Sequence, residues 1–243
     1  MQTSSERDVL DKIRCQPYYA VRFVPASVDL ELQKSRIRTI VTNDAVRLRG
    51  WDFPCDVADV MYNGQSFVGA FIDWSSHVEA WRFYASGQFV YFGNPWDLAM
   101  DLQQRVRADF DKNVLLAHPS QRDTVAGVFS FVGLIYSITE FYLFASRLTG
   151  SLEQQDAMLE VSMRNIDRWA LTSGQPGVPF YHFYQARVNN ITLRPSGGPS
   201  LLSDPVGAAN NGLRELFDIF NWDAAESMIR DWQDRLTSRR FAN

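Results

Sequence analysis

The stretch SFVGAFIDWSSHVEAWRFYASGQFVYFG, residues 66–93, carries the clearest structural signal in this chain. Aromatic and aliphatic side chains alternate with small or polar ones in three runs, 66–74, 77–84 and 88–93. Such alternation is typical of half-buried strands, and the short polar or glycine-containing links between the runs are typical of tight turns. The stretch therefore predicts an antiparallel β-meander.

Similar patterns outside the meander predict the remaining elements. Strand patterns occur at 18–25, 46–49, 157–164, 166–172 and 180–188. Helical spacing occurs at 30–44, 95–112, 205–220 and 223–238, with a short amphipathic segment at 1–14. We expect a loop at 190–205, which is rich in Pro, Gly and Ser, and a core position for His182. Strands interleaved irregularly with helices favour the α+β class over a doubly wound sheet.

The longest apolar segment spans residues 124–148. Within it, 125–144 has the length of a membrane span, and Glu140 is its single charged residue. A membrane span would place that carboxylate in hydrocarbon, and no basic cluster directly flanks the segment. A helix buried in a globular core is equally apolar, so we expect a central core helix and no membrane contact.

These elements predict one α+β domain over 1–243, in which the meander packs on the central helix and two helices close the chain. Residues 1–16 and 239–243 are expected to be flexible. A hydrophobic content of 46% in 243 residues is ample for a core.

Composition excludes several functions. A net charge of −4 argues against a globally basic protein that coats nucleic acid. No Walker loop, dinucleotide-binding GxGxxG or GxSxG motif is present, so we expect no cofactor. Cys15 and Cys55 lack metal-like spacing, and no secretory signal opens the chain, which predicts a cytoplasmic protein with free thiols.

The segment VRLRGWDFP, residues 46–54, combines two arginines with a strand pattern and a turn. Its alternation predicts that Arg47 and Arg49 point outward and that the turn presents Trp51. A candidate phosphate or nucleic-acid surface comprises Lys34, Arg36, Arg38, Arg47 and Arg49. An ordinary surface neutralised by nearby acids is the alternative.

The meander also contains a polar cluster. If 77–84 is a continuous strand, His77 and Glu79 share one face with Trp81, and Arg82 lies on the other. With Asp73 they could serve a metal-dependent hydrolase or nuclease; a polar pair on a solvated face is the alternative. A zinc deaminase is excluded because no cysteine follows residue 79. The candidate binding residues are Arg47, Arg49, Trp51, Trp81 and Arg82.

Four segments, the RGWDFP corner, the meander, TEFYLFASRL at 139–148 and LFDIFNWD at 216–223, carry a family resemblance. Over most of residues 20–225 the chain resembles uncharacterised bacterial proteins in which a similar region accompanies a DNA-binding domain of the Schlafen AlbA-2 type. That domain is missing here. The resemblance implies an accessory or sensing domain with a role in regulation or antiviral defence.

The leading hypothesis is a non-enzymatic binding module, a sensor or adaptor, that binds a protein partner or self-associates. The alternative is the hydrolase or nuclease based on Asp73, His77 and Glu79. One structural observation bears most on a ligand-binding or catalytic role: whether Arg49, Trp51, His77 and Glu79 border a common pocket.

Overall fold

The computed structural model describes residues 5–27, 29–56, 61–75, 77–98, 100–113, 121, 123–175, 178 and 180–238. Its main sheet is antiparallel, in the order β10-β7-β1-β5-β4-β3-β2, with β9 also paired to β7. The strands are β1 (Tyr18–Pro25), β2 (Met61–Asn63), β3 (Phe67–Trp74), β4 (His77–Tyr84), β5 (Phe89–Gly93), β7 (Ala157–Arg164), β9 (Asn190–Thr192) and β10 (Ser196–Gly197).

The predicted meander is present as β3, β4 and β5 in consecutive antiparallel order. Trp74 pairs with His77 at one end of the β3–β4 hairpin, and Phe67 pairs with Tyr84 at the other. Strand β1 then joins the meander to β7, which comes from the second half of the chain. The sheet therefore ties distant segments together.

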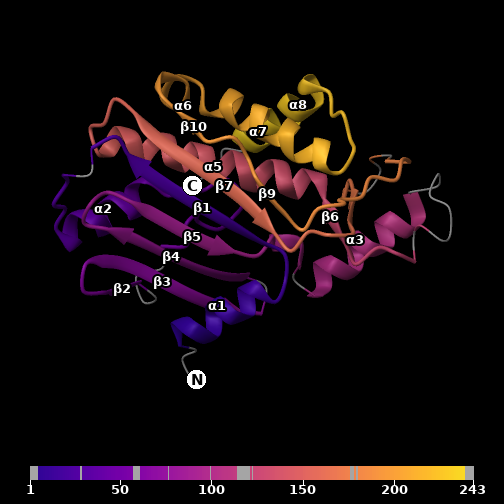
Figure 1. The fold of residues 1–243 in the computed structure, drawn as a ribbon, viewed down its shortest axis with the longest axis horizontal. Coiled ribbons are helices and arrows are strands. Elements are labelled where there is room, and N and C mark those ends of the chain that lie inside the picture. The colour runs from indigo at the N-terminus through magenta and orange to yellow at the C-terminus, as the bar shows by residue number, and fades with distance from the viewer. Residues whose placement is uncertain are drawn as a thin grey trace.

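Helices cover one face of this sheet. The central helix is α5 (Phe131–Ser151), and α2 (Lys34–Asp44), α6 (Pro199–Ser203), α7 (Pro205–Ile219) and α8 (Glu226–Thr237) contact it. Figure 1 shows α6, α7 and α8 grouped together beside α5, away from β2 and β3. The core between sheet and helices includes Phe23, Phe83, Phe89, Phe141 and Phe144. The α+β class, the central helix and the two C-terminal helices are confirmed.

The central helix begins later than its apolar composition suggests. Gly127–Ser130 forms strand β6, which pairs in parallel with β8 (Trp169–Thr172), and the helix starts at Phe131. The hydroxyl of Ser130 accepts a hydrogen bond from the Gly133 N–H, which caps the helix. Among the described helices, none is long and apolar enough to cross a membrane.

The other face of the sheet carries helix α1 (Glu6–Arg14), visible apart from the other helices in Figure 1. Ser5 and Asp8 form a capping box at its start. Val9 and Ile13 are buried and pack with Ala80 of β4. Within the segment 1–16 that is expected to be flexible, residues 6–14 thus form a helix with an apolar stripe against the sheet; 1–4 and 239–243 lie outside the described residues.

Predictions for several other segments also need correction. Residues 46–49 form a single bridge, Val46 with Phe53, instead of a strand, because the chain reverses at Gly50, whose φ is +92°. Residues 180–188 also contribute only a bridge, between Gln185 and Ala170, and His182 is exposed. The predicted loop at 190–205 contains β9, β10 and α6, while 95–112 divides into a 3-10 turn, η1 (Trp96–Leu98), and α3 (Met100–Asn113).

Candidate functional site

A pocket lined mainly by aromatic side chains lies where the β3–β4 hairpin meets the 46–54 corner. It encloses about 200 Å³. Its lining residues are Trp51, Cys55, Trp74, His77, Trp96 and Leu102. We call this space the outer pocket.

Each tryptophan reaches the outer pocket from a different element. Trp74 ends β3 and is the register partner of His77, so these two rings lie side by side with centroids 6.3 Å apart. Trp51 follows the reversal at Gly50, and its centroid lies 6.1 Å from that of Trp96 in η1. Trp51 and Trp74 are 38% and 43% exposed, which is unusual for side chains this large and apolar.

His77 and Glu79 form a hydrogen-bonded pair at the base of this pocket. Nε2 of His77 lies 2.8 Å from Oε2 of Glu79, and Oε1 accepts the Cys55 N–H at 2.7 Å. Glu79 is fully buried, so a polar pair on a solvated face is the wrong interpretation. Burial is the largest single effect and lowers the pKa of His77, but the charge of Glu79, its hydrogen bond to the imidazole and the charge of Glu140 together outweigh burial, so the pKa of His77 is raised.

Arg49 and Glu140 form a second, deeper pair. Nε of Arg49 donates to Oε1 of Glu140 at 2.9 Å, and Nη2 donates to Oε2. Burial raises the pKa of Glu140, while Arg49 opposes that effect. The prediction that Arg49 points outward is wrong, because the reversal at Gly50 turns its side chain toward α5, where it is only 10% exposed.

His77, Glu79 and Arg49 border a second, smaller space of about 20 Å³, which we call the inner chamber. Arg49, Trp51, His77 and Glu79 all line it. The outer pocket and the inner chamber share Trp51, His77 and Trp96 as walls. The convergence of these side chains was the observation expected to bear most on a binding or catalytic role, and it is present.

Asp73 does not join this cluster. Side chains alternate along β3, so Ile72 and Trp74 share the face of His77, while Asp73 points to the other face and pairs with Lys12 of α1. Among the described residues, no group of three or more His, Cys, Asp and Glu side chains is arranged to hold a metal ion. The three residues predicted for a hydrolase are thus not brought together.

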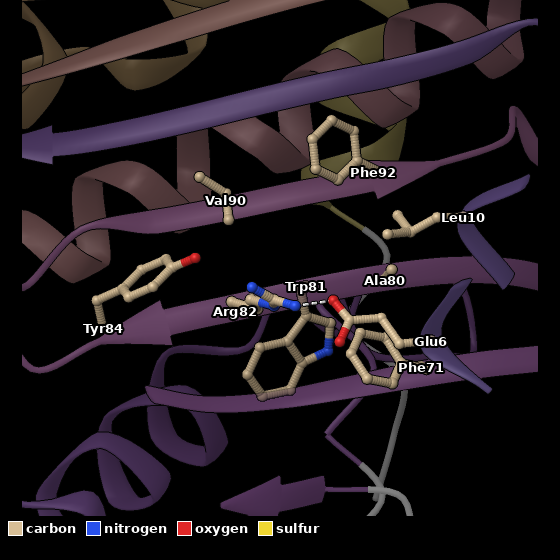
Figure 2. Close-up of a pocket in the computed structure, with 9 residues that line it drawn as sticks. All are labelled: Glu6, Leu10, Phe71, Ala80, Trp81, Arg82, Tyr84, Val90 and Phe92. Carbon is tan, nitrogen blue, oxygen red and sulfur yellow. Dashed lines mark hydrogen bonds and ion pairs between the residues drawn. The ribbon is translucent and has the colours of Figure 1, made fainter. Parts of the chain in front are cut away.

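Trp81 and Arg82 lie on opposite faces of β4. Trp81 is buried in the core, where its Nε1 donates to the Cys55 carbonyl at 3.0 Å and supports the outer pocket from behind. Arg82 pairs with Glu6 of α1 beside a shallow cavity of about 150 Å³ (Figure 2). Arg82 therefore belongs to the contact that holds α1 on the sheet.

Two of the five predicted cations pair with carboxylates, and the other three donate to backbone carbonyls. Arg47 is paired with Asp52 at 2.9 Å and Asp56 at 3.1 Å, and Arg49 is paired with Glu140. Lys34, Arg36 and Arg38 on α2 donate to backbone carbonyls. The anion-binding surface predicted from the sequence is therefore reduced to three cations on one helix.

Sequence reasoning missed Glu140 and Trp96 as site residues. Glu140 was noticed only as the single charge in an apolar segment, and a buried charge generally needs a cationic partner. That signal predicted a cationic partner for Glu140 but did not identify the residue. Nothing near Trp96 marks it as a pocket residue.

Comparison with family models, with known proteins and with solved structures gives no match for this chain. The resemblance to Schlafen-associated bacterial proteins stays a prediction.

Proposed function

We propose that this protein is a binding module that takes a small organic ligand into the outer pocket and acts as a sensor or adaptor. The observation that supports this most is the grouping of Trp51, Trp74 and Trp96 around one concave space. Ligand sites are typically apolar hollows with a few polar groups that fix orientation. The His77–Glu79 and Arg49–Glu140 pairs would supply the polar groups.

The exposure of the tryptophans supports a binding role independently. Burying a large aromatic side chain is worth about 1.5–3 kcal/mol, so a fold gains by covering it. Trp51 and Trp74 are nonetheless 38% and 43% exposed at the mouth of the pocket. A ligand that covers both rings would recover part of that free energy on binding.

The polar groups at the base are held before any ligand arrives. Glu79 accepts from Cys55 and interacts with His77, while Glu140 takes two bonds from Arg49. Fixed groups of this kind reduce the ordering cost of binding. This favours recognition of a ligand over a reaction that needs a free nucleophile or base.

The biological setting is proposed from the sequence. The two cysteines have no metal-like spacing in the sequence, which suggests the cytoplasm, and the resemblance suggests bacterial regulation or antiviral defence with a protein partner or a second copy of the chain. Two of the five predicted cations are neutralised, so nucleic acid is not part of this proposal.

Fluorine NMR of protein labelled with 5-fluorotryptophan tests the proposal. The chain has seven tryptophans, so pocket and non-pocket signals can be compared in one spectrum after assignment by single Trp→Phe variants. Titration with a library of small aromatic and aliphatic compounds should shift the signals of Trp51, Trp74 and Trp96. The signals of Trp81 and Trp232 in the core should respond less.

Compounds that shift only tryptophans outside the pocket would contradict the proposal. Affinity unchanged in both Trp51→Ala and Trp74→Ala would do the same. Metal-dependent hydrolysis of nucleic acid that is lost in Glu79→Gln, with the fold intact, would favour the nuclease instead.

A further inference from the structure

The outer pocket and the inner chamber differ in what they can accept. The outer pocket, about 200 Å³, is walled by rings. A dry apolar cavity of roughly 150 Å³ is enough for a benzene molecule. The inner chamber, about 20 Å³, has room for one atom of the size of a water oxygen.

Among the described residues that line the inner chamber, two side chains each carry a hydrogen-bond donor without a partner. The donors are Nη1 of Arg49 and Nε1 of Trp96, both buried, and both side chains line the chamber. Arginine and tryptophan only donate. A buried donor left unpaired costs about 1–3 kcal/mol, so an acceptor atom placed here would be favoured.

The carboxylates of the two buried pairs are already used. Glu140 takes both bonds from Arg49, and both oxygens of Glu79 are engaged by Cys55 and His77. Because the donors of Arg49 and Trp96 are unpaired while these carboxylates are already bonded, the site favours a ligand that accepts hydrogen bonds.

A cationic ligand would be disfavoured, although aromatic pockets often bind cations. The guanidinium of Arg49 already lies over the Trp51 ring, 5.0 Å from its centroid. The imidazole of His77 gains a proton more readily than a free histidine, because Glu79 raises its pKa against the opposing effect of burial. A second cation would meet both groups.

From these observations we infer that the ligand is a planar aromatic or heteroaromatic ring that carries a carbonyl-type oxygen, either an amide carbonyl or a carboxylate. The ring fills the outer pocket between the tryptophans. The oxygen enters the inner chamber and accepts from Arg49 and Trp96. This inference rests on the proposed function, since it names the ligand class of the same pocket.

Four probes of similar size test the ligand class on the unmodified protein: benzamide, benzoate, toluene and benzylammonium. Binding is followed by the fluorine signals of Trp51, Trp74 and Trp96. Benzamide or benzoate should bind with a dissociation constant on the order of 1 mM, typical of fragments. Each should bind about tenfold more tightly than toluene, which lacks the oxygen, and than benzylammonium. Comparison of the first two separates a carbonyl from a carboxylate ligand.

Trp96→Phe keeps a ring in the wall and removes one donor. It should weaken benzamide or benzoate about three- to tenfold and leave toluene unchanged. Trp74→Phe is the matched control, because Trp74 lies at the mouth, and it should affect all probes alike. Equal loss for toluene in Trp96→Phe would overturn the role of Nε1.

Different results would contradict the ligand class and the binding function. If toluene or benzylammonium binds the same three tryptophans as tightly as benzamide and benzoate, the inferred ligand class is wrong and the binding function stands. If none of the four probes shifts any of the three signals up to its solubility limit, the result counts against both.

Discussion

Nε2 of His77 lies 2.8 Å from Oε2 of Glu79, a carboxylate that is completely buried. Because a carboxylate only accepts, the imidazole donates its Nε2 proton to it. The carboxylate also accepts from the Cys55 backbone, which joins the 46–54 corner to the sheet. The His77–Glu79 pair thus stabilises both the wall of the pocket and the 46–54 corner, which contains Trp51.

The His77–Glu79 pair should make stability depend on pH. Burial lowers the pKa of His77 and Glu79 raises it, with a net value above that of the unfolded chain. The folded protein then binds the proton more tightly, so the stabilisation is fully present below about pH 6.5 and is lost as the pH rises through the folded-state pKa. Urea denaturation should therefore show a difference in unfolding free energy between wild type and His77→Gln that becomes smaller as the pH rises.

Glu79→Gln supplies the control for that experiment. In this background the raising effect of the carboxylate is gone, so the pH dependence caused by His77 should disappear or reverse. A difference between wild type and His77→Gln that grows with pH would contradict the assignment.

The two arginines of the 46–54 corner should differ sharply in their effect on stability. Arg49→Met leaves Glu140 buried without a partner and should cost about 3–5 kcal/mol of unfolding free energy. The Arg47 side chain is half-exposed, so water can partly replace its pairs with Asp52 and Asp56, and Arg47→Met should cost less than Arg49→Met, on the order of 1 kcal/mol. Chemical denaturation measures both, and the double variant Arg49→Met with Glu140→Leu should recover much of the loss. Similar values for Arg47 and Arg49 would mean that the buried pair is not formed.

Gly133 should be required for the position of Trp96. A Cβ at Gly133 would lie 2.7 Å from Nε1 of Trp96, so Gly133→Ala must push the indole toward the pocket. Such overpacking costs about 1–3 kcal/mol, and fragment binding should weaken with it. Gly150→Ala in the same helix meets open space and should be neutral or stabilise by up to about 1 kcal/mol. Thermal denaturation and the fluorine titration check both variants, and unchanged binding in Gly133→Ala would contradict the contact.

Helix α1 should contribute to the stability of the whole domain. Ile13 is fully buried between the helix and β4, so Ile13→Ala should cost about 2–4 kcal/mol. Arg7 on the exposed side of the same helix is 90% exposed, and Arg7→Ala should change stability by less than about 0.5 kcal/mol. If Ile13→Ala is as mild as Arg7→Ala, the helix does not pack as described.

Local pattern was sufficient for several of the longer strands. The alternation in 18–25, 77–84 and 157–164 predicted β1, β4 and β7 with their bounds, because one covered face of a strand imposes a period of two on its own residues. The same logic failed at 46–49. There the chain reverses at Gly50, and Val46 forms only a single bridge with Phe53. A strand needs a neighbouring strand to pair with, and alternation within a short segment does not reveal whether such a neighbour exists.

The sequence by itself determined the α+β class, the meander, and the sharing of one strand face by His77, Glu79 and Trp81. The tertiary structure alone decided the site. It paired Arg49 with Glu140, separated by 91 positions, and removed Asp73 to the opposite face. It also brought Trp51, Trp74 and Trp96 around one pocket. The reason is that local periodicity fixes the direction of a side chain, while its partners depend on contacts between distant segments that only the folded chain creates.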